Sequence, residues 1–279
     1  MEGDEIKKEV RQRYAQVVSE RISCCGPSAG CCGPALQPEI QSLKIGYSEN
    51  DLQAVPEGAN LGLGCGNPLA HAALKPGDTV IDLGSGAGFD CFLAAAKVGP
   101  EGRVIGVDMT PEMIDAARKN AAKGNYRNVE FRLGEIENLP VADKEGDMVI
   151  SNCVINLSPD KARVFREAYR VLKPGGRLMV SDIVLLGDLP EGVRQSIPAY
   201  VACVAGAVKK EDYLAAIKGA GFADIRVLEE TLFPLLEMIQ DPTVQAVLEG
   251  LNLEPTEAED LSRRVASIKV SAVKPLNGI

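Results

Sequence analysis

The chain has 279 residues, of which 46% are hydrophobic and 25% are charged, and its formal net charge is −9. This composition is typical of a globular protein, and the acidic balance argues against DNA, RNA or an anionic membrane as its main partner. No apolar run approaches the roughly 20 residues of a membrane helix, and the charged N-terminus does not resemble a signal peptide. We therefore expect a cytoplasmic protein without a nucleic-acid or membrane partner.

Residues 1–60 are expected to form a helical extension rich in cysteine. Apolar side chains at helical spacing predict an amphipathic helix over residues 4–22. Glycines and prolines then interrupt regular structure in a segment that carries four cysteines: Cys24, Cys25, Cys31 and Cys32. Cytosolic thiols stay mostly reduced, so structural disulfides do not readily explain them.

From about residue 75 the sequence alternates between strand and helix patterns. Strands are predicted over 79–83, 103–108, 129–133, 147–151 and 177–183. Helices are predicted over 90–97, 111–123 and 160–171, and the run from Lys173 to Gly176 is a stop signal after the last of them. Near-continuous apolar strands in such an alternation indicate a doubly wound α/β fold with a mostly parallel sheet.

The remainder of the chain is less regular. Residues 189–208 are expected to be inserted helical material, followed by a helix over 210–219. Strands over 223–229 and 266–273 would then form an antiparallel edge of the sheet.

A glycine-rich turn follows the first strand and opens the next helix. The strand ends near Asp82, and the turn has the pattern G-x-G-x-G through Gly84, Gly86 and Gly88. The dinucleotide fingerprint requires glycine where this chain has Phe89. A second carboxylate, Asp108, ends the next strand, where it can accept both hydroxyls of a ribose. An acid ahead of the turn suits a ligand with a cationic centre and no pyrophosphate, such as S-adenosylmethionine (SAM); the alternative is that the turn only packs tightly.

Residues 80–183 together resemble the class I SAM-dependent methyltransferases. The resemblance implies a Rossmann-like, seven-stranded, mostly parallel sheet with a reversed last strand, and SAM at the carboxyl ends of the strands. On this interpretation the methyltransferase domain covers residues 61–279 and contains a substrate-capping insertion around 187–209. The family pattern implies these cofactor-binding residues: Asp82, Gly84, Ser85, Gly86, Asp108, Met109, Glu135, Ile136 and Asn152.

Three single cysteines fall where a methyl acceptor is expected. Cys65 stands in a glycine-flanked loop, Cys153 directly follows the fourth strand, and Cys203 lies in the inserted segment. A free cysteine is often only a small buried hydrophobic residue, and we favour that interpretation for Cys91. For Cys153 the position at a strand end favours a functional role.

The segments 62–68, 151–157 and 202–207 resemble the arsenite methyltransferases. This resemblance covers residues 45–208 and implies that Cys65, Cys153 and Cys203 are catalytic residues that bind trivalent arsenic. Soft thiolates suit this thiophilic centre, and its lone pair would attack the methyl group without a protein general base. The implied activity is arsenic detoxification that produces methylarsenicals and S-adenosylhomocysteine. The resemblance also implies that a thiol reductant, glutathione or thioredoxin, is the co-substrate. It further implies that arsenic arrives as a thiol conjugate and that thioredoxin is a partner.

The four N-terminal cysteines allow several interpretations. In the family, N-terminal cysteines are implied to deliver arsenic or to exchange disulfides; Cys32 is one candidate for this, but the spacing does not choose among the four. A Cys₄ zinc site is a rival, although adjacent pairs depart from the usual C-x₂₋₄-C spacing. A surface metalloid trap is the third.

Two other functions are compatible with the same residues. A SAM-dependent C- or O-methyltransferase of a small organic molecule would keep its turnover after Cys153→Ser. A non-catalytic thiol protein that binds metalloids or zinc would keep its function after Asp108→Ala.

Overall fold

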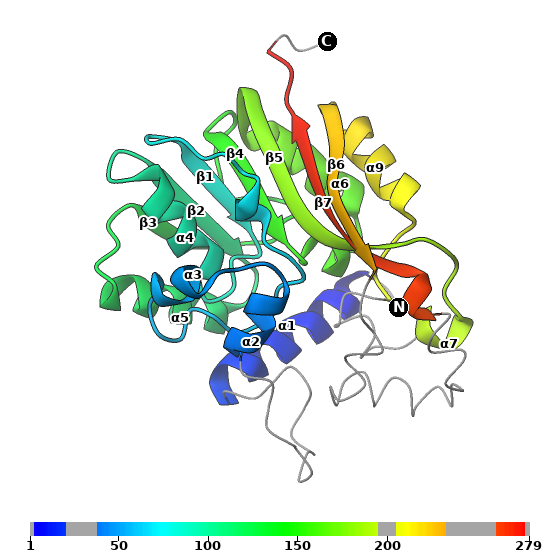
Figure 1. Cartoon of the computed structure of the whole chain (residues 1–279), viewed down its shortest axis with the longest axis horizontal. Coiled ribbons are helices and arrows are strands. Elements are labelled where there is room, and N and C mark those ends of the chain that lie inside the picture. The colour runs from blue at the N-terminus through cyan, green and yellow to red at the C-terminus, as the bar shows by residue number, and fades with distance from the viewer. Residues whose placement is uncertain (1–2, 21–37, 195–204, 233–260, 277–279) are drawn as a thin grey trace.

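The computed structural model describes residues 3–20, 38–194, 205–232 and 261–276. Its centre is a seven-stranded sheet in the order β3-β2-β1-β4-β5-β7-β6 (Figure 1). The strands are β1 (Thr79–Leu83), β2 (Arg103–Asp108), β3 (Val129–Leu133), β4 (Gly146–Asn152), β5 (Leu172–Leu185), β6 (Ala223–Leu232) and β7 (Val265–Val273). The first five strands pair in parallel, and β7 runs antiparallel to both β5 and β6. The predicted α/β fold class and the reversed last strand are confirmed.

Helices cover both faces of this sheet. They are α4 (Phe89–Val98), α5 (Pro111–Lys123), α6 (Lys161–Val171) and α9 (Lys210–Gly219). Val80 of β1 belongs to a buried cluster with side chains of α4 and α5, whereas Ile81 belongs to a second cluster with side chains of α6 and α9. Successive strand residues point to opposite faces, so a strand covered on both sides must be apolar throughout.

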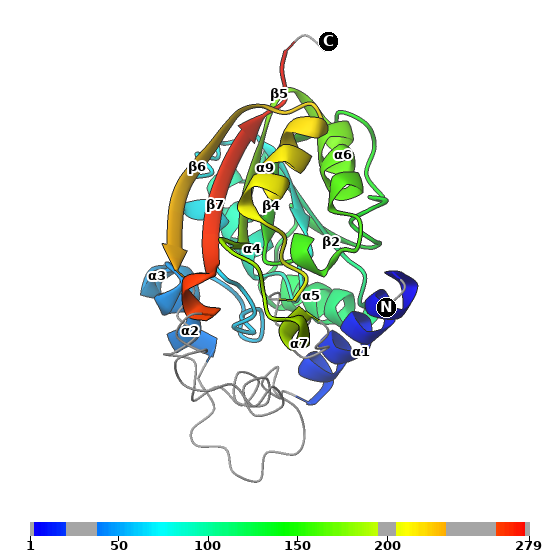
Figure 2. The same cartoon turned by 90° about the vertical axis from the view of Figure 1, so that its right-hand side faces the viewer.

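Three N-terminal helices lie along one edge of the molecule. Helix α1 (Gly3–Glu20) packs against α5, and α2 (Pro38–Lys44) and α3 (Glu49–Gln53) follow it (Figures 1 and 2). Short 3₁₀ turns are η1 (Pro68–Ala70) and η2 (Ile155–Leu157). In the described part of the chain, no helix combines the length and apolarity that crossing a bilayer requires.

The predicted start of the fifth strand is corrected. Helix α6 ends at Val171 as expected, but β5 begins at once with Leu172 rather than at residue 177. The segment 173–176 is absorbed into the sheet because Gly175 donates to the carbonyl of Lys274 and Lys274 donates to that of Gly176. A register shift between β4 and β5 accommodates the extra residues.

The expected inserted helical material is described only in part. It begins with the short helix α7 (Glu191–Arg194), and residues 195–204 lie outside the described ranges.

Candidate functional site

The glycine turn joins β1 to α4 as the sequence predicts. The backbone N–H groups of Gly84 and Ser85 both donate to the carbonyl of Val107 on β2, at 2.8 and 3.0 Å. Gly84 has φ +70°, and a Cβ there would lie 2.4 Å from a methyl carbon of Val154. Glycine is required at this position because an L side chain would be strained and would also clash.

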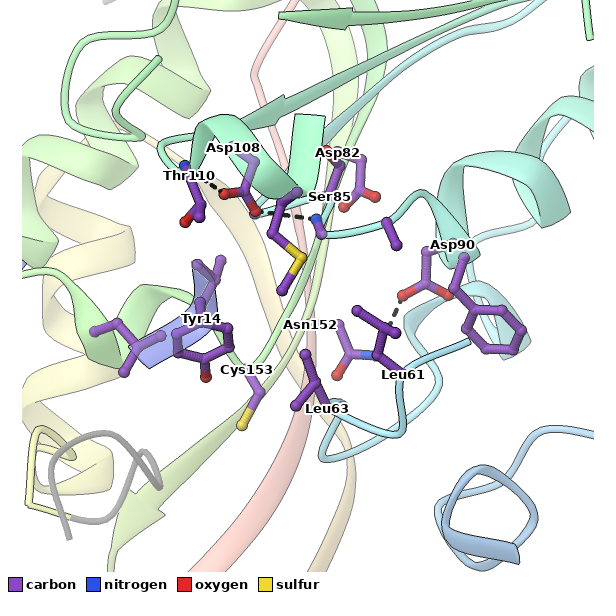
Figure 3. A pocket seen from close by; sticks show the side chains of 18 of the residues that line it. Tyr14, Leu61, Leu63, Asp82, Ser85, Asp90, Asp108, Thr110, Asn152 and Cys153 are labelled. Carbon is purple, nitrogen blue, oxygen red and sulfur yellow. Dashed lines mark hydrogen bonds between the residues drawn. The ribbon is translucent and has the colours of Figure 1, made fainter. Parts of the chain in front are cut away.

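A cavity opens beside this turn at the carboxyl ends of the strands. Its volume is about 1080 Å³ including the space at its open mouth, which is the scale of small-molecule sites, roughly 300–1000 Å³. Figure 3 shows Asp82 and Asp108 on one side of it and Asn152 and Cys153 on the other. Nine residues predicted for the site line it: Asp82, Gly84, Ser85, Gly86, Asp108, Met109, Ile136, Asn152 and Cys153.

Asp108 is fixed at the end of β2 by the backbone. Its carboxylate accepts from the N–H of Gly86 at 3.0 Å and from that of Thr110 at 2.8 Å. Burial raises the pKa of Asp108, and these two N–H groups oppose the rise. A carboxylate has about four acceptor positions, so Asp108 can take further donors from the cavity.

Asp82 is the most deeply buried acid of the cavity wall. Burial, and then repulsion from Asp90, raise the pKa of Asp82 well above its ordinary value. Cys91 donates its S–H to Asp82 at 3.2 Å, and burial together with this neighbour raises the pKa of the Cys91 thiol. Cys91 is therefore an inert core thiol, because reactivity requires the thiolate.

Cys65 and Cys153 meet beside the cavity although 88 positions separate them. Their sulfur atoms and a carboxylate oxygen of Asp182 all lie within 4.8 Å of one another, and all three side chains are buried. Cys153 has φ +59°, a left-handed conformation that is rare for a residue with a side chain. Its N–H nevertheless donates to the carbonyl of Ser181 on β5, at 2.8 Å, which fixes the turn out of β4.

Asn152 ties the loop of Cys65 to the end of β4. Its side-chain oxygen accepts from the N–H of Cys65 at 3.1 Å, and its amide nitrogen donates to the carbonyl of Gly66 at 2.8 Å. The loop packs so closely that a Cβ at Gly66 would lie 1.9 Å from the hydroxyl oxygen of Ser181. The glycines on both sides of Cys65 thus allow the loop to reach the sheet.

The amide of Asn152 also contacts a buried pair from two other segments. Its nitrogen lies 2.9 Å from the hydroxyl of Tyr47 and 3.2 Å from Asp90, and Tyr47 donates to Asp90 at 2.7 Å. Burial raises the pKa of Asp90 to about 6, opposed by the bonds from Tyr47 and Asn152. This network connects the start of α4 with the Cys65 loop.

Helix α1 forms one wall of the cavity. Lys7, Val10 and Tyr14 line it, and Lys7 pairs with Glu135 at 2.7 Å and with Glu137 at 3.2 Å. Glu135, which was predicted for the site, does not itself line the cavity. It forms an ion pair with Lys7, which does line it.

Some predicted residues are not placed. Cys203 and Cys32 lie outside the described residues, as do Cys24, Cys25 and Cys31. Conversely, sequence reasoning missed Tyr47, Asp90 and Asp182 as part of this region. For Asp182 there was a usable signal, because an acid within an otherwise apolar strand end is expensive to bury without a purpose.

The chain matches the family described as "Methyltransferase domain" over residues 74–221. It is 51% identical over 231 residues to an arsenite methyltransferase of Halobacterium salinarum, covering 80% of this chain and 59% of the relative. It is 34% identical over 241 residues to human arsenite methyltransferase, covering 83% of this chain and 62% of the relative. The chain thus spans about three fifths of the length of these curated relatives.

A solved structure also resembles the chain. It is an arsenic(III) S-adenosylmethionine methyltransferase from Chlamydomonas reinhardtii, with a TM-score of 0.61 and 33% identity. The match covers 84% of this chain and 73% of that one. With a family match over more than half of its length and the corresponding sheet topology, the chain belongs to the methyltransferase-domain family.

Proposed function

We propose that this chain is a SAM-dependent methyltransferase that methylates trivalent arsenic bound to thiolates. The observation that carries the proposal is the convergence of Cys65 and Cys153 beside a cavity that Cys153 and the glycine turn both line. The similarity to arsenite methyltransferases supports the same activity. The products would be methylarsenicals and S-adenosylhomocysteine, and the role would be arsenic detoxification in the cytoplasm.

The residues of the cavity suit SAM. The buried hydroxyl of Ser85 has no hydrogen-bond partner among the described residues, so it is available to a ligand. Asp108 retains acceptor capacity for ribose hydroxyls, and Met109 and Ile136 would flank the adenine. When bound, SAM supplies an electrophilic methyl group on a sulfonium centre. The buried acids Asp82 and Asp90 suit a cationic ligand better than a phosphorylated one, because a nearby cation would favour their ionised forms.

The two thiols suit a soft, thiophilic substrate. Trivalent arsenic bound by thiolates keeps a lone pair, so the nucleophile needs no proton removed from it. What the protein contributes is position: holding reacting atoms about 3–3.5 Å apart and aligned can contribute about 7–11 kcal/mol to lowering a barrier. Asn152 serves this purpose, because it fixes Cys65 against the strand that carries Cys153.

Cys203 would be the third arsenic ligand, and Cys32 is a candidate for delivering arsenic. Glu135 belongs to the proposed cofactor-binding set. Glutathione or thioredoxin would be the reducing co-substrate, and arsenic would arrive as a thiol conjugate. We also propose an N-terminal extension over 1–60 and a methyltransferase domain over 61–279 with a capping insertion around 187–209.

The test is to incubate the purified protein with SAM, glutathione and arsenite and to separate the arsenic species formed. The proposal requires methylated arsenic from the wild type and at least a 100-fold loss in Cys65→Ser, Cys153→Ser and Cys203→Ser. Cys91→Ser is the matched control, because this buried thiol lies in the core, and it should retain methylation. Full activity in one of the three variants would remove that cysteine from the site. Binding of arsenite without any SAM-dependent product would instead indicate a non-catalytic thiol protein.

A further inference from the structure

We propose that Cys65, Cys153 and Asp182 form a binding site for a thiophilic divalent cation, Zn²⁺ or Cd²⁺. The three ligand atoms, two sulfurs and one carboxylate oxygen, lie within 4.8 Å of one another in a buried cluster. Ligand atoms around a tetrahedral zinc ion lie roughly 3.5–3.8 Å apart. Closing the cluster on such an ion therefore needs side-chain movements of only about 1 Å.

The donor set is suited to a divalent cation. Cysteine sulfur and aspartate oxygen are both ordinary zinc ligands, and three protein ligands leave a fourth position for water or a ligand. The surroundings are apolar: Leu157, Ile183 and Leu185 belong to the same buried cluster as the two cysteines. An ion held there would be shielded from water, which strengthens its attraction to the thiolates and the carboxylate.

The carboxylate of Asp182 is oriented by neutral groups. One oxygen accepts from the side chain of Asn156 at 2.8 Å and from the N–H of Ile183 at 2.9 Å. The other accepts from the hydroxyl of Tyr213 at 3.0 Å, which leaves it one lone pair. A buried carboxylate usually has a charged partner; none of these three donors carries a charge, and Lys161 acts on Asp182 electrostatically. A cation between Asp182 and the thiols would favour the ionised carboxylate and place a positive charge in direct contact with it.

Trivalent arsenic and a divalent cation should depend on Asp182 differently. Arsenic is satisfied by sulfur ligands, whereas the cation requires the carboxylate to complete its donor set. The two would share Cys65 and Cys153 and therefore compete. This competition rests on the proposed function; the cation site does not.

The test measures cation binding directly, without SAM, by equilibrium dialysis with Zn²⁺ and by calorimetric titration with Cd²⁺. The parent protein carries Ser at positions 24, 25, 31, 32 and 203, because those cysteines are alternative ligands. We expect one bound ion per chain, with at least about a tenfold weaker Kd in Asp182→Asn. Glu137→Gln, a change at another buried acid whose partners are Ser158 and Lys7, should stay within about twofold of the parent.

The inference is overturned if the parent binds no ion, or if Asp182→Asn binds as tightly as the parent. If Asp182→Asn is unfolded by circular dichroism, the ¹¹³Cd NMR shift of the Cd²⁺-loaded parent decides. A shift typical of two sulfur ligands with oxygen supports the site, and one typical of three or four sulfurs overturns it.

Two further measurements separate this inference from the proposed function. When Asp182→Asn is introduced into the otherwise wild-type sequence, the Kd for arsenite should change by less than about threefold. In the unchanged wild type, Cd²⁺ should inhibit arsenite binding. If the wild type methylates arsenite but the parent with five serines binds no ion, only the cation site is overturned. Cation binding by a protein that never methylates arsenite would overturn only the proposed function.

Discussion

The two ends of the cavity are assembled in different ways. The glycine-turn end comes from one short stretch between β1 and α4, with Asp108 from the adjacent strand. The thiol end combines the Cys65 loop, the residue after β4 and Asp182 within β5. The first depends on local backbone geometry, whereas the second depends on long-range hydrogen bonds such as those of Asn152. Variants at the two ends should therefore fail differently: one in cofactor affinity, the other in arsenic affinity and stability.

The largest effect is expected from the pH dependence of Asp182 at the thiol end. Burial raises the pKa of Asp182 from its ordinary value of 3.8 to about 7, so the folded protein keeps a proton that the unfolded chain loses. The free energy of unfolding therefore falls between about pH 4 and pH 7, by on the order of 4 kcal/mol from this group. Asp182→Asn should remove that part of the slope in urea denaturation at pH 5 and pH 8. An unchanged slope in the variant would contradict the assignment.

At the glycine-turn end, Asp108→Ala should weaken binding of S-adenosylhomocysteine by about 10–100-fold, measured by calorimetry. The variant loses the carboxylate that would accept the ribose hydroxyls, and hydrogen bonds to a charged group contribute about 1.5–3 kcal/mol each. The Kd for arsenite should stay within about twofold. Asp147→Ala is a matched control, because Asp147 also accepts a backbone N–H, that of Thr79 at the start of β1. Equal losses in both variants would mean that the effect is structural.

Asn152→Ala should separate the two ends further. It removes the bonds that hold the Cys65 loop, so we expect about a tenfold weaker Kd for arsenite and a loss of about 1–3 kcal/mol in unfolding free energy. Asn128→Ala provides the control: Asn128 donates to two backbone carbonyls, of Ala95 and Gly99, outside the cavity. It should lose stability without losing arsenite affinity. If both variants bind arsenite like the wild type, Asn152 does not position Cys65.

The smallest effect concerns the backbone of Cys153. At φ +59° an L side chain costs about 1–2 kcal/mol, so Cys153→Gly should unfold at higher urea concentration than Cys153→Ala. The difference should be about 1 kcal/mol. In helix α4 the order should reverse, with Cys91→Ala more stable than Cys91→Gly, because glycine is unfavourable inside a helix. The same order at both positions would contradict the strained conformation of Cys153.

The fold was largely predictable because its elements are recorded in local patterns. The strand Thr79–Leu83 and the turn at Gly84 follow from a short apolar run and from glycine spacing. The position of Cys153 at a strand end was equally local. The beginning of β5 was not, because the segment 173–176 resembles a stop signal until Lys274, which directly follows β7, pairs with it.

The thiol end was less predictable because it, too, depends on contacts between residues far apart in the sequence. Tyr47 reaches Asp90 across 43 positions, and Tyr213 reaches Asp182 across 31. Neither partner is marked by a spacing rule, since these contacts exist only after the sheet has brought its strand ends together. The sequence also predicted the helix of residues 4–22, but its role as a cavity wall depends on packing against α5.

That packing has a consequence for how the protein is made. Helix α1 is synthesised before the residues it contacts: Glu135, which pairs with Lys7, is 128 positions further along the chain. At about 5–20 residues per second, translation needs roughly 6–26 s to produce that partner. Until α5 and Glu135 have been made, helix α1 lacks these contacts, so this wall of the cavity stays incomplete until the middle of the chain has emerged.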